Sequence, residues 1–198
     1  MKEPVKFGII LIAFCALSAG LLAYVNGVTA PRIAQMELEQ TLASYKEIFG
    51  DEADKFEKYD EAKLAKVQEK YPDILDIFVA TKGDKVVGYG INAATSGFGG
   101  SMTNAIGILL DGDKIAGFRN ISNGETKGFG SHIADEDYIK SYEGKSAAEP
   151  LEYSKDPQGE NQVMWITGAT VTSKAVVKGD NMVIEAYNDL LKNDGGAK

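Results

Sequence analysis

The uncharged stretch from Phe7 to Val25 places the strongest constraint on how this chain folds. It runs for nineteen residues. As an α-helix with a rise of about 1.5 Å per residue, it is about as long as the roughly 30 Å hydrocarbon core of a bilayer. Lys2 and Lys6 precede it. Because cationic residues favour the cytoplasmic side, we expect a single-pass anchor in the cell membrane, with a cytoplasmic N-terminus and everything after Asn26 extracytoplasmic.

Two other interpretations of this stretch compete with an anchor. A cleaved signal peptide would use Ser18-Ala19-Gly20 as its cleavage site, but such peptides have a shorter apolar region. A lipoprotein signal would use Cys15, but the bulky Phe14 stands immediately before it, where a small residue is expected. An uncleaved anchor fits the length and the flanking charges best.

Composition excludes several classes of function for the part outside the membrane. The net charge of the chain is -8, so no basic face is available for nucleic acid phosphates. No cysteine follows Cys15, and His132 is the single histidine. A disulfide, a thiolate zinc site, an iron–sulfur cluster and a multi-histidine zinc site are therefore excluded there. We expect His132 to cap or line the start of a helix, and we predict no metal site.

The pattern after the anchor predicts an α+β domain with an antiparallel sheet and flanking helices. We divide the chain into an anchor (1–28), a helical stalk with peripheral helices (29–72) and one compact domain (73–198). Pro31 suits the first turn of a new helix, which is either a stalk extending the membrane helix or the first helix of the domain. The other expected elements are a peripheral helix and loop (51–70), two hairpins (75–80 with 85–91, and 105–110 with 114–121), a helix (132–142), a strand (162–166) and a long helix (174–191).

The stretch from Ile166 to Lys174 is a candidate anion site. It reads Ile-Thr-Gly-Ala-Thr-Val-Thr-Ser-Lys and stands between the last predicted strand and the long helix. The first turn of a helix has unpaired N–H groups and a partial positive charge, which together hold a phosphate. The alternative is that Thr172 or Ser173 is simply the N-cap of the helix.

Two glycine-rich segments accompany this stretch. One runs from Thr95 to Ser101, between the hairpins, and the other from Asn123 to Ser131, after the second hairpin. Taken alone they are typical of turns, because glycine and asparagine adopt turn conformations readily.

These residues together resemble the FMN-binding domain family, which includes the G subunit of the Rnf ferredoxin:NAD oxidoreductase and the C subunit of the sodium-translocating NADH:quinone reductase. The family signature, Ser/Thr-Gly-Ala-Thr-x-Thr/Ser-Ser, is matched at every position from Thr167 to Ser173. Members attach FMN through its phosphate, as a phosphoester, to a threonine. The resemblance implies this ester on Thr170, with Thr172 as the second choice.

Three departures from the family pattern are visible. Met164 stands where the family usually has an aspartate that helps the attaching flavin transferase to read its target. Lys127 and Phe129 replace the proline and leucine of the family's Glu-Thr-Pro-Gly-Leu-Gly segment. The resemblance implies that residues 73–198 form the FMN-binding domain, with a cofactor site made of Glu125, Thr126, Gly128, Thr167, Gly168, Ala169, Thr170, Thr172 and Ser173.

The function implied is that of an electron relay. The sequence supplies no substrate base, no activated nucleophile and no nicotinamide fold, so we assign no catalytic residue. We expect an electron-transfer subunit of a membrane-bound, ion-translocating Rnf complex, with the other membrane subunits and a maturing flavin transferase as partners. Two alternatives stay open: a non-redox, membrane-anchored binding module, in which Thr170 and Thr172 are only helix caps, and a free-standing surface flavin reductase.

Overall fold

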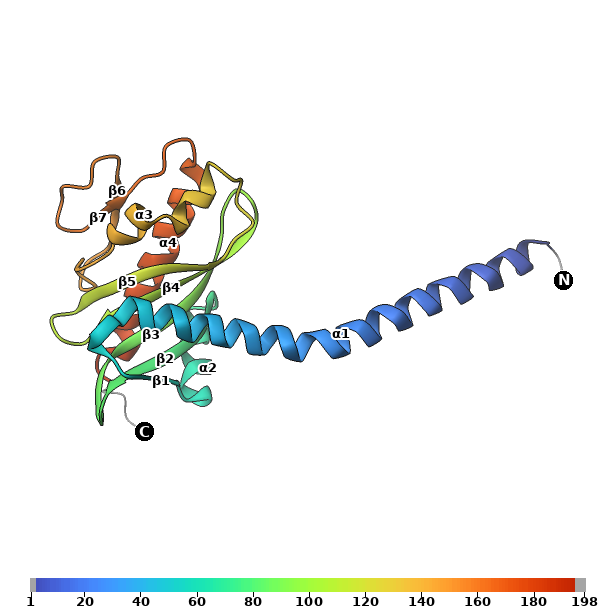
Figure 1. Ribbon diagram of the computed structural model, residues 1–198, viewed down its shortest axis with the longest axis horizontal. Coiled ribbons are helices and arrows are strands. Elements are labelled where there is room, and N and C mark those ends of the chain that lie inside the picture. The colour runs from blue at the N-terminus through green and yellow to red at the C-terminus, as the bar shows by residue number, and fades with distance from the viewer. Residues whose placement is uncertain (1–2, 195–198) are drawn as a thin grey trace. The chain divides into compact units, whose positions relative to one another are not determined.

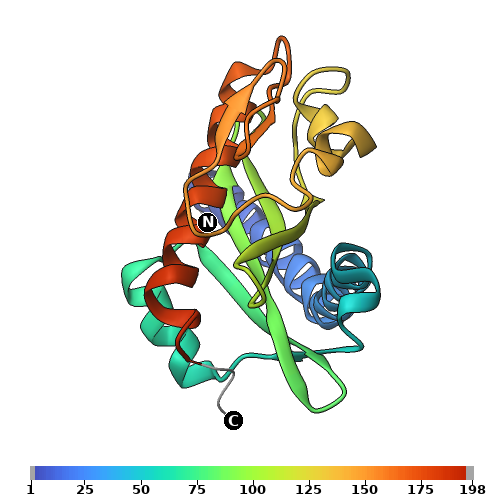
Figure 2. The same ribbon diagram turned by 90° about the vertical axis from the view of Figure 1, so that its left-hand side faces the viewer.

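The computed structural model describes residues 3–194 (Figures 1 and 2). Lys2, one of the two cations behind the predicted membrane orientation, lies outside the described residues. The chain divides into two compact units, one ending at Gln40 and one beginning at Thr41. The domain boundaries at residues 28 and 72 stay a prediction.

Helix α1 (Glu3–Phe49) contains the whole apolar stretch. By length and composition, this helix is able to cross a membrane. No new helix begins at Pro31, because α1 continues through this residue without a break, which agrees with the alternative of a stalk extending the membrane helix. Proline has no N–H to donate, so the helix lacks one backbone hydrogen bond at this position.

A five-stranded antiparallel sheet, in the order β1-β2-β3-β4-β5, forms the centre of the second unit. Both predicted hairpins are confirmed. Strands β3 and β4 run further than expected and take in Ser96 and Ser101, because their backbone pairing continues to that pair. The strands are β1 (Lys55–Lys58), β2 (Ile74–Lys82), β3 (Lys85–Ser96), β4 (Ser101–Leu109) and β5 (Lys114–Ser122).

Strand β1 lies in a region where the sequence predicted only a peripheral helix and loop. Its residues, Lys-Phe-Glu-Lys, pair with β2 at the edge of the sheet. The charged composition concealed this strand, because an edge strand is held by backbone pairing and needs only one apolar anchor. Phe56 supplies that anchor by packing on Tyr45. Helix α2 (Glu61–Lys70) then follows, with Asp60 as its N-cap.

Each face of the sheet carries a separate apolar core. Helix α4 (Thr170–Ala186) contributes Val176, Val177 and Val183 to the larger core on one face, and Figure 2 shows this helix running along the sheet. The smaller core gathers Tyr45, Ile48 and other residues around the C-terminal end of α1. The sheet is therefore held between two helical layers, which fixes the position of α4 relative to the strands.

The remaining elements are short and lie around these layers. The predicted helix over 132–142 is instead a 3₁₀ turn, η2 (Gly130–Ala134), followed by α3 (Glu136–Lys140), because the chain turns at Asp135, whose backbone is extended. His132 lies in η2, with Nδ1 2.6 Å from the carboxylate of Asp135. The others are η1 (Gly50–Glu52), the parallel pair β6 (Glu152–Ser154) and β7 (Gln162–Met164), and the π-helical turn η3 (Tyr187–Leu191).

Asp180 is a carboxyl group in the middle of the larger core. It is 1% exposed and accepts a hydrogen bond from the Tyr142 hydroxyl at 2.8 Å. Burial raises the pKa of Asp180 from 3.8 to about 8, and the Tyr142 hydrogen bond acts in the opposite direction. Between about pH 4 and pH 8, the folded state therefore binds a proton that the unfolded state has released, and stability falls as pH rises.

We expect Asp180→Asn to remove this pH dependence, because the amide stays neutral and still accepts from Tyr142. The free energy of unfolding of the wild type should fall by up to about 1.4 kcal/mol per pH unit more steeply than that of the variant. Trp165, the only tryptophan, reports unfolding by fluorescence. The matched control is Glu185→Gln on the exposed face of α4. Equal slopes for wild type and Asp180→Asn would contradict this account.

Candidate functional site

The motif from Thr167 to Ser173 forms the N-terminal end of helix α4. The helix begins at Thr170, four residues earlier than predicted, and its N-cap is Ala169. The alternative that Thr172 or Ser173 is the N-cap is therefore wrong, because both lie inside the first turn. No side chain caps this end of α4 in the described part of the chain. Its first N–H groups thus remain available to an anion.

Ser173 explains why the motif turns so sharply. It is fully buried, and its Oγ donates to the Ala169 carbonyl at 3.0 Å and accepts from the Ile166 N–H at 3.1 Å. Gly168 precedes this turn with φ of +82°, a left-handed conformation that favours glycine. Ser173 therefore stabilises the strand-to-helix connection through both of its hydrogen bonds.

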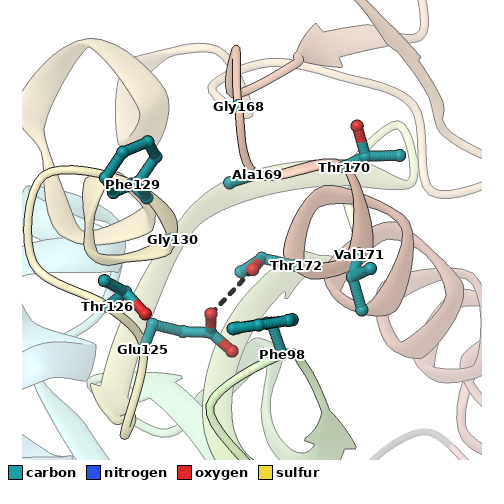
Figure 3. Close-up of a pocket in the computed structure, with 10 residues that line it drawn as sticks. All are labelled: Phe98, Glu125, Thr126, Phe129, Gly130, Gly168, Ala169, Thr170, Val171 and Thr172. Atoms are coloured by element: carbon teal, nitrogen blue, oxygen red, sulfur yellow. Dashed lines mark hydrogen bonds between the residues drawn. The ribbon is translucent and has the colours of Figure 1, made fainter.

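A cavity of about 410 Å³ opens beside this end of α4 (Figure 3). Its volume lies within the range of small-molecule binding sites, about 300 to 1,000 Å³. Three segments distant in sequence form its walls: the loop between β3 and β4, the loop after β5, and the motif. The lining residues are Phe98, Glu125, Thr126, Phe129, Gly130, Gly168, Ala169, Thr170, Val171 and Thr172.

Glu125 joins these three segments. Its carboxylate is 8% exposed, and Oε2 accepts from the Thr172 hydroxyl at 2.7 Å, the bond drawn as a dashed line in Figure 3. Oε1 accepts from the Gly99 N–H at 3.0 Å. Gly130 passes so close that a Cβ atom there would overlap Oε2 of Glu125 and lie 2.8 Å from Oγ1 of Thr172. A side chain at position 130 would therefore displace the Glu125 carboxylate from this position.

The two candidate threonines differ in accessibility. Thr172 is 1% exposed, and its hydroxyl is engaged by Glu125. Thr170 is exposed at the edge of the cavity, and Figure 3 shows its hydroxyl pointing away from the Glu125–Thr172 pair. Of the two hydroxyls, that of Thr170 is the one an incoming group reaches without breaking a buried hydrogen bond.

Apolar side chains surround the cavity. Phe98 is 74% exposed, Phe129 54% and Val171 52%. In Figure 3, Phe129 lies on the side opposite Phe98 and Val171. Exposed aromatic rings on both sides of a cavity suit a flat, conjugated ligand, which stacks on or packs edge-on against them.

The cavity contains most of the predicted cofactor-site residues. Six of them line it, whereas Thr167, Gly128 and Ser173 do not. Their contacts with a cofactor stay a prediction. Phe98, Phe129, Gly130 and Val171 line the cavity but were not chosen from the sequence. The sequence could have indicated Phe98 and Phe129 as site residues, because a large apolar side chain in a glycine-rich surface loop is unlike the small and polar residues typical of turns.

Known families match the chain in two places. The FMN-binding domain family matches residues 97–185, which contain every residue lining the cavity. The RnfG N-terminal region matches residues 2–48. An uncapped helix end suits the phosphate of FMN, and an aromatic rim suits its ring. The fold and the cavity therefore define an FMN-binding flavoprotein that carries an apolar N-terminal helix.

Similar proteins identify the family more closely. The G subunit of the Na⁺-translocating ferredoxin:NAD⁺ oxidoreductase complex of Acetobacterium woodii is 35% identical over 96% of this chain and 95% of its own length. The G subunit of the proton-translocating complex of Clostridium ljungdahlii is 30% identical over 86% of this chain and 84% of its own. The chain belongs to the family of G subunits of Rnf-type, ion-translocating oxidoreductase complexes.

Solved structures share the fold. The crystal structure of NqrC from Shewanella oneidensis has a TM-score of 0.53 and 19% identity, and the match covers 62% of this chain and 61% of that one, less than two thirds. The C subunit of the Na⁺-translocating NADH-quinone reductase of Parabacteroides distasonis also has a TM-score of 0.53, with 23% identity over 67% of this chain and 68% of its own. The predicted fold class is confirmed.

We expect Gly130→Ala to lower the flavin content of the purified protein. The added methyl group displaces the Glu125 carboxylate and separates it from Thr172, so that the cavity walls lose their connection. Gly117→Ala in β5 is the matched control, since a Cβ there lies 3.5 Å from its nearest neighbour, in ordinary contact. Flavin absorbance per protein measures the effect. Full flavin content in Gly130→Ala would show that the connection is dispensable.

Proposed function

We propose that this protein is the flavin-carrying electron-transfer subunit of a membrane-bound, ion-translocating ferredoxin:NAD⁺ oxidoreductase complex. The observation that carries this proposal is the 35% identity with the G subunit of A. woodii over 96% of the chain, apolar helix and domain together. The apolar segment of α1 supports attachment to the membrane. The protein would bind the other subunits of such a complex, in the membrane.

The FMN would be held at the N-terminal end of α4. The free N–H groups of its first turn, together with the helix dipole, would bind the phosphate. Phe98 and Phe129 would lie beside the ring. When bound, the flavin accepts and donates electrons, and the residues of this chain bind and orient it. No general base or nucleophile is assigned to the cavity, which suits a relay.

Attachment to Thr170 as a phosphoester is the second part of the proposal. Its support is accessibility, because Thr170 is exposed at the helix terminus whereas the Thr172 hydroxyl is buried against Glu125. A covalent bond also has a physical advantage for a domain outside the cytoplasm. A flavin that dissociates there is lost, so the ester keeps occupancy high whatever the affinity.

Thr170→Ala should abolish covalent flavin, whereas Thr170→Ser should retain it. Thr172→Ala should keep the ester while loosening the cavity, because it removes only the hydrogen bond to Glu125. Flavin fluorescence of denatured protein in a gel, followed by peptide mass mapping, distinguishes these variants. Covalent flavin in Thr170→Ala together with its absence in Thr172→Ala would move the ester to Thr172. Wild-type protein without any flavin would disprove the proposed function itself.

Maturation by a flavin transferase would depend on residues near the motif. Met164, at the end of β7, stands where the family has an aspartate, and it is only partly buried. We expect Met164→Asp to raise the flavin-bearing fraction when the protein is produced with a limiting amount of transferase. The measurement is intact mass at several times after induction. A fraction that is unchanged or lower at every time would show that this position does not govern recognition.

The membrane orientation also belongs to the proposal. Lys6 precedes the apolar segment, and cationic residues favour the cytoplasmic side. We propose a cytoplasmic N-terminus and an extracytoplasmic flavin domain. Protease treatment of right-side-out vesicles tests this, because it should release the flavin-bearing domain only if that domain faces outward.

A further inference from the structure

The mouth of the cavity differs in charge from the rest of the chain. The whole sequence has 29 acidic and 21 basic residues. Across the three segments that form the cavity walls (95–101, 123–131 and 166–174), the single carboxylate is Glu125, which is buried. The cations in these segments, Lys127 and Lys174, are both exposed. These three segments therefore carry no exposed acid, although the protein as a whole is acidic.

The same mouth gathers the most exposed large apolar side chains of the described domain. Leu75, Tyr153 and Leu190 are each exposed to 41% or less. Among the large apolar side chains described from residue 41 onward, the three most exposed are Phe98, Phe129 and Val171, and all three line this one cavity. Exposed apolar side chains gathered in one place mark a surface that another molecule covers.

Both lysines are positioned to meet that molecule and not the contents of the cavity. Lys127 stands in the turn closed by the hydrogen bond from the Phe129 N–H to the Thr126 carbonyl. Lys174 lies one turn along α4 from Val171, on the same face of the helix. Neither residue lines the cavity, and within residues 3–194 neither forms an ion pair.

Lys174 also borders a shallow neighbouring depression of about 620 Å³, where Lys178 adds a further cation and Glu152 is the one carboxylate. The positive rim thus extends along α4 away from the cavity. An occupant that covers the mouth and follows this direction would meet two lysines of the same helix. This extent suits a protein surface, since a bound small molecule would fill the cavity alone.

We propose that the mouth of this cavity, with Phe98, Phe129 and Val171 at its centre and Lys127 and Lys174 at its rim, docks a carboxylate-bearing face of another redox subunit. This inference rests on the proposed function. Redox partners commonly meet over small interfaces of less than about 1,200 Å². Complementary charges around an apolar centre orient such partners. Docking here brings the partner directly over the flavin site, and thus close enough for electron exchange.

Zero-length carbodiimide cross-linking of the intact complex tests the contact, because it joins an ammonium only to a carboxylate that touches it. Mass mapping should find Lys127 or Lys174 linked to an aspartate or glutamate of another subunit. Lys127→Gln/Lys174→Gln should lose this link. The matched control is Lys66→Gln/Lys85→Gln, which should keep it. Lys66 is exposed on α2. Lys85 is exposed at the start of β3, and the loop that borders the cavity follows the other end of that strand.

Activity gives the second measurement. In membrane vesicles, Lys127→Glu/Lys174→Glu should lower ferredoxin-dependent NAD⁺ reduction by about tenfold or more, since opposed like charges replace attraction. Flavin content should stay unchanged, and the control protein Lys66→Glu/Lys85→Glu should have the activity of the wild type.

Three results would overturn the docking proposal. One is that Lys127 and Lys174 form cross-links only within their own chain. Another is that both charge-reversed proteins lose activity equally. Loss of flavin in Lys127→Glu/Lys174→Glu would assign the lysines to the cofactor and also overturn it. Wild-type complex without flavin would instead contradict the proposed function, whatever the cross-links.

Discussion

The buried carboxylate of Glu125 is the constraint on which the site depends. A buried charge must be hydrogen-bonded, and Glu125 meets this requirement with the Thr172 hydroxyl and the Gly99 N–H. Thr172 is 47 residues away along the chain, so these bonds form only when sheet and helix are already packed correctly. Gly130 approaches the same carboxylate so closely that a side chain there would displace it. The cavity is thus a product of the whole fold and not of one loop.

Helix α4 links the core to the site. Its middle part buries Val176, Val177 and Val183 against the sheet, while its first turn borders the cavity. The buried Ser173 makes the connection rigid, because it holds both the preceding strand end and the helix start. A phosphate at this terminus would therefore meet N–H groups whose positions are set by hydrophobic packing well away from it. Such preorganisation spares a binding site the cost of ordering its own groups.

Local patterns predicted the elements that depend on local interactions. The turn triplets around Gly83 and Gly112 predicted both hairpins, since glycine takes the backbone conformation required there. Strand β1 escaped prediction because its pairing with β2 is a backbone interaction that charged side chains do not reveal. The sequence predicts the start of α4 four residues too late. A run of threonine and serine is typical of a cap, but here tertiary packing buries Thr172 and Ser173 inside the helix.

The sequence by itself determined the apolar N-terminal helix, the antiparallel hairpins and the match of Thr167–Ser173 to a phosphate-binding motif, because each is written in consecutive residues. Only the tertiary structure decided which of the two candidate hydroxyls, those of Thr170 and Thr172, is accessible. It also brought Phe98, Phe129 and Val171 around one cavity and made Glu125 the partner of Thr172. The physical reason is that exposure and long-range hydrogen bonds depend on how the sheet and α4 pack together. The pattern of apolar and polar residues along the sequence does not predict this packing.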